Sequence, residues 1–331
     1  RFEVYSILCL GFFLLKYYVM CIGGSMNKVT DILENVSSVI IGKNDVAELV
    51  MTSIIAGGHI LLEDVPGTGK TMMAKAFARS IDGEFSRIQF TPDLLPSDIL
   101  GLNYFSQKEG EFVFRKGPIF TSILLADEIN RATPRTQSSL LESMEEHQVT
   151  IDGETRKLGD PFFVIATENP IETAGTYPLP EAQTDRFFMV LEMGYPSKEE
   201  EVKILSRFSL SDPLDTLESV SGKEDLEEMR KEAGKVYVHP DILDYMASIT
   251  ARTREKDGMG ISTRGTLALM RGAKAWAMLE GYDYVTVSHV KKVAPHILSH
   301  RLGIDIKRGR KEILSILSSL PAPTEEWGKR Q

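Results

Sequence analysis

The sequence of 331 residues predicts an α/β fold, in which a parallel sheet covered by helices on both faces is followed by a smaller, all-helical domain. Two observations lead to this prediction. Short apolar runs alternate with stretches of helix formers over residues 26–195, as strand–helix–strand units do. From residue 196 the composition shifts to helix formers with few β-branched runs. We therefore expect an α/β domain over 26–195 and a helical domain over 196–331.

The first 25 residues fit neither domain. Residues 4–22 are nearly all apolar or aromatic, and this length is close to the ~20 residues that a membrane helix needs. Lys16 interrupts the run and would be costly to bury in a membrane. Residues 23–26 read Gly-Gly-Ser-Met, like a linker before a natural start. We expect a non-native or upstream extension and a cytoplasmic protein; the alternative is a membrane anchor and a membrane-associated protein.

Five apolar runs are the expected strands, at residues 59–63, 86–90, 123–127, 162–167 and 187–192. Two hairpins are expected between them. Residues 102–115 place two aromatic runs around a Gln-Lys-Glu-Gly turn, and residues 149–156 contain an Asp-Gly pair, a strong tight-turn signal. Either hairpin could face a pore or a partner; the alternative is that its aromatic side chains pack locally.

A glycine-rich loop follows the first expected strand and precedes a run of helix formers. Gly67 and Gly69 allow the backbone to curl so that its N–H groups point into one concavity, where phosphate oxygens bind. Lys70 can reach the β- and γ-phosphates of a nucleotide, and the hydroxyl of Thr71 can bind Mg²⁺. Asp64 stands where the usual pattern has glycine, but the glycines nearest the phosphates remain. The expected phosphate contacts come from Val65, Pro66, Gly67, Thr68, Gly69, Lys70 and Thr71.

Polar side chains also follow two later strands, where the carboxyl ends of a parallel sheet form a site. Successive residues of a strand point to opposite sides, so Asp127 and Glu128 should have different roles. Asp127 is the candidate for holding Mg²⁺ through its water shell, and Glu128 for polarising the water that attacks the γ-phosphate. Asn169 follows the fourth strand, and its amide is interpreted as a sensor of the γ-phosphate or of that water.

The order and spacing of these motifs resemble those of the AAA+ ATPases. Their detailed amino-acid sequences resemble those of the MoxR family. The resemblance runs from about residue 26 to about residue 320 and rests on segments 61–71, 126–132, 137–146, 166–170 and 179–187. It implies an αβα domain that binds ATP and Mg²⁺, a helical lid, and a homo-oligomeric ring, usually a hexamer, with ATP at each subunit boundary. It further implies a chaperone-like role in remodelling protein clients, often with partners that carry a von Willebrand factor A domain. Asp64 is ordinary for this family.

The resemblance also assigns roles to particular arginines. Arg186 matches the position from which helix-2-insert relatives project an arginine finger into the neighbouring subunit, and Arg131 is the rival for this role. Arg264 matches their second sensor, which contacts the γ-phosphate. A guanidinium group suits both roles because it stays charged and forms a rigid fork for phosphate oxygens. The alternative is an ordinary surface ion pair.

The resemblance also covers two other segments. Ile41 and Gly42 are expected among the nucleotide contacts, and hairpin 102–115 resembles the helix-2 insert.

In the second domain, helices are expected at residues 198–207, 223–233, 240–254, 264–280, 286–299 and 308–318. The first has an N-terminal signal, because Ser197 is followed by acidic residues in the first turn. Residues 209–221, with Pro213 and several Ser and Asp residues, are expected to be an irregular connection.

Composition excludes some functions and leaves others open. A net charge of −9 argues against nonspecific attraction to nucleic acid or anionic lipid, although a local basic patch could still exist. No nucleic-acid partner is therefore expected, and a DNA motor is disfavoured. The two cysteines, Cys9 and Cys21, precede the ATPase region, so no disulfide framework is expected there and a reducing compartment fits. A chelatase-type motor subunit for metal insertion stays open. So does an ATP-locked regulatory scaffold with little turnover, although the Asp127–Glu128 pair argues against it.

Overall fold

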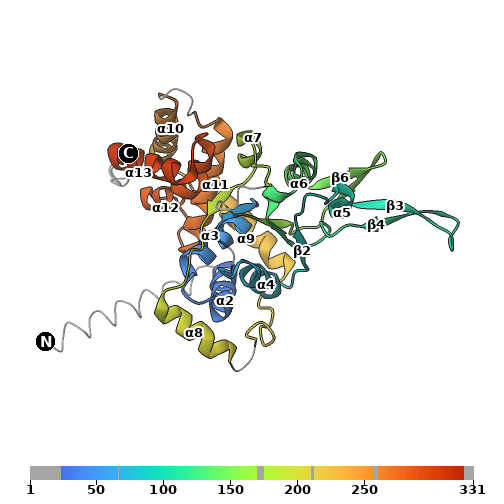
Figure 1. Ribbon diagram of the computed structural model, residues 1–331. Helices are drawn as coiled ribbons and strands as arrows, with labels where there is room; N and C mark the ends of the chain where they lie inside the picture. The colour runs from blue at the N-terminus through green and yellow to red at the C-terminus, as the bar shows by residue number, and fades with distance from the viewer. Residues whose placement is uncertain (1–23, 66, 170–174, 210–211, 256–259, 324–331) are drawn as a thin grey trace.

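The computed structural model describes residues 24–65, 67–169, 175–209, 212–255 and 260–323 (Figure 1). Its centre is a parallel sheet of five strands in the order β2–β5–β8–β1–β9. The strands are β1 (Ile60–Glu63), β2 (Phe85–Gln89), β5 (Ile123–Asp127), β8 (Phe163–Glu168) and β9 (Met189–Leu191). All five expected strands are thus confirmed, with shifts of one or two residues at their ends.

Apolar residues cover both faces of the sheet, as expected for buried parallel strands. Because side chains alternate along a strand, Ile60 and Leu62 of β1 pack in one core cluster and Leu61 packs in the other. The first cluster includes α2 (Gly24–Val39), α3 (Asn44–Ile55) and α4 (Lys70–Ser80). The second includes α5 (Pro96–Leu100) and α6 (Pro134–Glu146). The sheet is therefore the middle layer of an αβα sandwich.

Helices α2, α3 and α6 were not predicted, although the sequence of α2 carries a helical signal. Its buried residues Val29, Ile32 and Val36 recur three and four positions apart, which is the spacing of one helix face. Helix α3 is less readable, because it is buried nearly all round and its apolar residues follow one another without a clear period.

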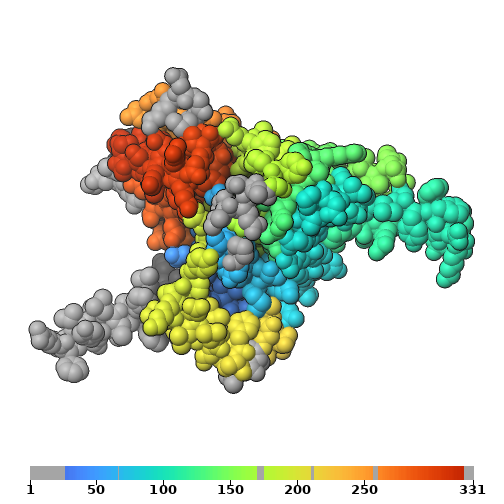
Figure 2. Space-filling view, viewed as in Figure 1, coloured from blue at the N-terminus to red at the C-terminus, as the bar shows by residue number. Residues whose placement is uncertain are grey.

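Both expected hairpins form. The first pairs β3 (Gly101–Ser106) with β4 (Glu111–Lys116), and the second pairs β6 (Gln148–Ile151) with β7 (Glu154–Lys157). They touch each other, because Asn103 donates a hydrogen bond to Asp152 at 2.8 Å and the Arg156 guanidinium lies 4.1 Å from the centre of the Phe114 ring. The first hairpin projects beyond the body of the protein (Figures 1 and 2). Phe112 near its tip is 74% exposed.

The six expected helices of the second region are confirmed. They are α8 (Lys198–Phe208), α9 (Lys223–Lys235), α10 (Pro240–Arg254), α11 (Thr263–Leu279), α12 (Val287–Leu298) and α13 (Ile306–Ser319). Helices α9 and α11 pack against α2 and α3, so residues of the helical region share a core with one face of the sheet. Helix α8 differs from the others because none of its side chains is fully buried.

The apolar segment 4–22, with Cys9 and Cys21, lies outside the described residues. Within the described part of the chain, no helix combines the length and the hydropathy that a membrane crossing requires.

A chain that starts at Met26 is expected to be soluble, folded and able to bind ATP. The first buried side chain of α2 is Val29, and the sheet, the glycine-rich loop and the second helical region all follow it. Melting curves and binding of a fluorescent ATP analogue should therefore match those of the full chain. Loss of either property on removal of residues 1–25 would show that the extension contributes to the fold.

Candidate nucleotide site

The glycine-rich loop has the backbone geometry of a phosphate cradle. Gly67 and Gly69 have φ angles of 81° and 92°, which L-residues with side chains rarely adopt, and Gly69 is the N-cap of α4. The N-terminus of α4 therefore opens onto the loop, and its unpaired N–H groups can bind an anion. The Lys70 ammonium group donates to the carbonyl of Asp64 at 3.1 Å, across the mouth of the loop. Thr71 follows in the first turn of α4, and Pro66 lies outside the described residues.

Asp64 has a structural role at the position where glycine is usual. Its carboxylate is buried and accepts three backbone N–H groups, from Val65 at 2.8 Å, Met193 at 2.9 Å and Gly194 at 3.0 Å. Met193 and Gly194 lie just beyond the carboxyl end of β9. The departure from glycine therefore ties the start of the phosphate loop to the chain that leads into α8.

A small apolar pocket of about 170 Å³ adjoins the loop. Its walls are Val39, Ile40, Ile41, Lys43, Gly67, Thr68, Gly69, Met72, Pro196, Ile204 and Phe208. An apolar pocket beside a phosphate cradle suits the flat base of a nucleotide. Sequence analysis placed Ile41 at the nucleotide but missed the contribution of α8, whose side chains Ile204 and Phe208 stand four residues apart on one helix face.

Gly42 lies beside this pocket rather than in its wall. Its φ angle is 75°, and a Cβ atom at this position would lie 1.9 Å from Oε1 of Glu200 in α8. Gly42 therefore allows the loop between α2 and α3 to pass close to α8.

Asp127 ends β5 and is held on both of its carboxylate oxygens. Arg87 Nη2 lies 2.6 Å from Oδ2, and the Thr167 hydroxyl donates to Oδ1 at 2.6 Å. The carboxylate is nevertheless partly exposed, and each oxygen has a further lone pair for a metal-bound water.

Glu128 lies in a left-handed backbone conformation with a φ of 56°, which is unusual for a residue with a side chain. Its backbone N–H is bound by the Thr167 hydroxyl at 2.8 Å. Its carboxylate accepts from Gln89 at 2.8 Å and from Arg131 at 3.1 Å. Such strained residues cluster at functional sites.

Strand alternation predicts that the side chains of Asp127 and Glu128 point to opposite sides of the sheet. In the structure both carboxylates instead contact β2. Asp127 binds Arg87 and Glu128 binds Gln89, and these two residues of β2 lie two apart and are hydrogen-bonded to each other at 3.1 Å. The strand ends at Asp127, so the left-handed turn at Glu128 replaces the alternation and brings both carboxylates toward β2.

Asn169 is buried directly after β8. The N–H of Asp64 donates to the carbonyl of Glu168 at 3.0 Å, so the start of the phosphate loop is fastened to the residue before Asn169. The structure thus gathers the glycine-rich loop, the carboxylate pair and Asn169 at the carboxyl edge of one sheet, as strand order requires.

A second group of carboxylates lies at the same edge, on the last residues of two strands. Glu63 and Glu168 are paired residues of the neighbouring strands β1 and β8. Burial raises the pKa of Glu63 to about 7, with further contributions from the negative charges of Glu168, Glu192 and Asp305 and an opposing one from Lys307. Burial also raises the pKa of Glu168.

The raised pKa of Glu63 predicts a pH-dependent stability. The folded protein keeps the Glu63 proton above pH 4.5, where the unfolded chain releases it, so stability falls as pH rises from 4.5 through 7. Glu63→Gln, which cannot ionise, should therefore melt about 1–3 °C above the wild type at pH 8 and at the same temperature as the wild type at pH 4, below the pKa of the unfolded chain. Glu63 and Glu181 line one pocket, and Glu181→Gln, which removes an exposed carboxylate from it, is the control. Equal melting temperatures of Glu63→Gln and the wild type at pH 8 would show that the pKa of Glu63 is not raised in the folded protein.

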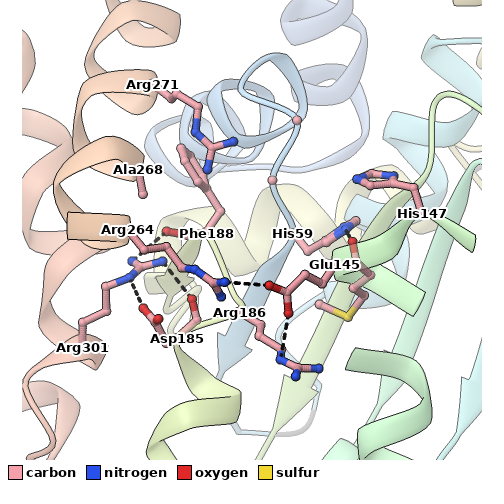
Figure 3. A pocket seen from close by; sticks show the side chains of 13 residues that line it. His59, Glu145, His147, Asp185, Arg186, Phe188, Arg264, Ala268, Arg271 and Arg301 are labelled. Carbon is pink, nitrogen blue, oxygen red and sulfur yellow. Dashed lines mark hydrogen bonds and ion pairs between the residues drawn. The ribbon is translucent and has the colours of Figure 1, made fainter. Parts of the chain in front are cut away.

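Arg186 and Arg264 lie together at the opposite edge of the sheet (Figure 3). Both contact Glu145, with Arg186 Nε at 3.3 Å from Oε2 and Arg264 Nη2 at 2.7 Å from Oε1. The pocket around them, of about 260 Å³, is also lined by His59, which precedes β1, and by Arg271. The structure therefore does not bring Arg264 or Arg186 to the phosphate loop of the same chain.

The separation follows from strand geometry. His59 lies at one end of β1 and Asp64 at the other, and five residues at about 3.3 Å each span about 17 Å. Arg131, the rival finger, lies at the carboxyl edge, where it binds Glu128 of its own chain. Arg186 and Arg264 therefore lie away from the carboxylate pair of their own chain, whereas Arg131 contacts it.

The residues present suit Mg²⁺ that arrives with a nucleotide. Among the residues that the structure describes, no group of three or more His, Cys, Asp or Glu side chains is arranged to hold a metal ion. Mg²⁺ rarely needs such a cage, because it keeps several waters and takes other ligands from phosphate oxygens. The hydroxyl of Thr71 and the carboxylate of Asp127 offer oxygen atoms, which are the ligands that Mg²⁺ prefers.

The chain is similar in sequence to known ATPases. Residues 59–189 match the ATPase family associated with various cellular activities (AAA), and residues 249–315 match the AAA lid domain. The chain is 51% identical to the uncharacterized protein YeaC of Bacillus subtilis over 272 residues, which are 82% of this chain and 85% of that protein. It is 41% identical to Chaperone MoxR1 of Mycobacterium tuberculosis over 278 residues, which are 81% and 73% of the two chains.

A solved structure shares the whole architecture. The crystal structure of a Cytophaga hutchinsonii protein described as an inferred ATPase superposes with a TM-score of 0.84 at 38% identity, and the match covers 91% of this chain and 96% of that one.

Proposed function

This chain belongs to the MoxR family of AAA ATPases, and we propose that it hydrolyses ATP with Mg²⁺ in a ring of identical subunits, usually six, in order to remodel protein clients. The observation that carries the proposal is the division of the site into two halves. The phosphate loop and the carboxylates lie at one edge of the sheet, and Arg186 and Arg264 lie at the other.

The first half binds the nucleotide and activates water. The loop N–H groups and Lys70 hold the phosphates, and the pocket beside Ile204 and Phe208 takes the base. Thr71 and Asp127 would hold Mg²⁺, which neutralises charge on the phosphate oxygens when it is bound. Glu128 accepts a proton from the attacking water, and Asn169 orients that water or the γ-phosphate.

The second half is supplied by the neighbouring subunit. In the transition state, negative charge spreads over the transferred phosphoryl oxygens, and guanidinium groups stabilise it. Arg186 and Arg264 line a pocket with His59, which lies about 17 Å along β1 from Asp64, so we assign both to the ATP of the adjacent subunit. The carboxylate pair is fully assembled in each subunit, which favours turnover over an ATP-locked scaffold.

Protein clients, and partners with a von Willebrand factor A domain, are proposed from the family and from the hairpins. The related protein of Mycobacterium tuberculosis is named a chaperone. On the first hairpin, Phe105 and Phe112 are 54% and 74% exposed and pack edge to face on each other, with ring centres 5.5 Å apart. Aromatic side chains on a projecting hairpin suit contact with another protein.

ATPase activity per subunit, measured against protein concentration with and without Mg²⁺, tests this function. Activity per subunit should rise with concentration as rings form, and removal of Mg²⁺ by a chelator should abolish it. A constant activity per subunit across dissociated and assembled protein, verified by light scattering, would show that each subunit contains a complete site.

A further inference from the structure

Glu145 joins the two arginines of the second half-site. It lies in the last turn of α6, Arg186 lies just before β9, and Arg264 lies in the first turn of α11. Each carboxylate oxygen serves one arginine, at 3.3 Å for Arg186 and at 2.7 Å for Arg264 (Figure 3). Three segments that are distant in sequence thus meet at one carboxylate.

The charges of this pocket leave Glu145 as the counter-ion of both arginines. Of the described residues that line the pocket, the other carboxylate is Asp185, which is held by the buried Arg301 at 2.7 Å. Arg271 faces the Phe188 ring, with its guanidinium carbon 5.6 Å from the ring centre. The single negative charge of Glu145 faces the three positive charges of Arg186, Arg264 and Arg271. The pocket therefore keeps a net positive charge that can attract an anion.

The contacts with Glu145 leave most of the arginine donors available. A guanidinium group has five N–H donors, and the contacts use Nε of Arg186 and Nη2 of Arg264. The remaining N–H groups can bind phosphate oxygens while the carboxylate still holds both side chains. Glu145 can therefore orient the arginines without blocking them.

We propose that Glu145 is a positioning residue, which holds Arg186 and Arg264 side by side so that both meet the terminal phosphates of the ATP bound by the neighbouring subunit. This inference rests on the proposed function. A long arginine side chain samples many rotamers in solvent, and fixing two of them before the phosphates arrive removes that entropic cost from the reaction.

The support of Glu145 is rigid. Helix α6 buries Leu140, Leu141 and Met144 in the core, so its last turn is fixed relative to the sheet. Its first turn begins at Pro134, close to Glu128 and Arg131 of the same chain, and its 13 residues span about 20 Å. One helix thus reaches from a subunit's own carboxylates to the arginines that it offers to its neighbour.

Kinetics of Glu145 variants test the proposal. Glu145→Ala should lower kcat by roughly 10–100-fold and change KM for ATP by less than about threefold, because ATP is bound by the other half-site. Glu145→Gln should lose less, because its amide oxygen still accepts from one arginine. Glu146→Gln, which changes the adjacent exposed carboxylate, should leave both constants unchanged. Equal melting temperatures of all variants would exclude unfolding.

Mixed rings separate positioning from a merely structural role. Glu145→Ala subunits should regain activity with Lys70→Ala subunits, which have an intact arginine half, but not with Arg186→Ala subunits. The triple variant Glu145→Ala, Arg186→Ala, Arg264→Ala should be no slower than the double variant Arg186→Ala, Arg264→Ala, since Glu145 acts only through these two side chains. If Arg186→Ala slows turnover but Glu145→Ala leaves it unchanged or raises it, this inference is wrong and the proposed function stands. If neither Arg186→Ala nor Arg264→Ala slows turnover, the shared site itself is wrong.

Discussion

Glu128→Gln protein is expected to bind ATP as tightly as the wild type and to hydrolyse it roughly 10²–10⁴-fold more slowly. The glutamine side chain has the size of glutamate and can keep contacts with Gln89 and Arg131, but it cannot take a proton from water. In the proposed function Glu128 acts on the attacking water and not on the bound phosphates, so the loss should appear in kcat and not in affinity.

Lys70→Ala is expected to show the opposite pattern, with ATP affinity lost. Lys70 Nζ lies 3.1 Å from the carbonyl of Asp64, at the mouth of the phosphate loop, and in the proposed function it binds phosphate in the ground state. Lys75→Ala on the exposed side of the same helix is the matched control and should leave affinity unchanged. Titration with a fluorescent ATP analogue and a steady-state ATPase assay separate the two patterns. Unchanged ATPase activity in the Glu128→Gln protein would overturn the role of Glu128.

The same Glu128→Gln protein provides a way to find clients. If ATP is held without turnover, the ring stays in one state and should retain partners that the wild type releases. A pull-down with this variant, compared with the Lys70→Ala variant that does not hold ATP, should enrich von Willebrand factor A domain proteins. Equal recovery with both variants would argue against an ATP-dependent interaction.

Arg186→Ala is expected to have the other large effect, a loss of turnover of about 10³–10⁵ with ATP affinity largely intact. Arg186 lines the pocket around His59 and not the pocket beside the phosphate loop, so its removal should spare nucleotide binding. Arg135→Ala, which removes an exposed arginine from the start of α6, is the control. A comparable loss in Arg131→Ala, with little effect in Arg186→Ala, would transfer the role to Arg131.

The fold could be predicted from the sequence because each strand and lid helix carries a local signal. Runs such as Ile123–Asp127 are short, apolar and bounded by turns, and α8 begins with a Ser197–Glu200 capping box. The phosphate loop and the two carboxylates were readable for the same reason, since each motif is contiguous in sequence. Buried helices without a clear period, such as α3, carry no comparable signal.

The parts that escaped prediction depend on contacts between distant segments. The role of Asp64 depends on its hydrogen bonds with the backbone of Met193 and Gly194. The role proposed for Glu145 depends on its contact with Arg264, which is 119 residues away. The left-handed turn at Glu128 depends on Thr167, which binds its N–H from the neighbouring strand. No local pattern specifies these pairings, because they arise only when strand order and helix packing are set.

Mixing two inactive variants tests most directly whether the site is shared between subunits. Arg186→Ala subunits keep an intact Lys70, and Lys70→Ala subunits keep an intact Arg186, so a complete site forms where the two meet. We expect each variant alone to be nearly inactive and the mixture to regain part of the wild-type ATPase activity. If mixed rings form, as verified by native mass spectrometry, and no activity returns, then Arg186 does not complete the site of a neighbour.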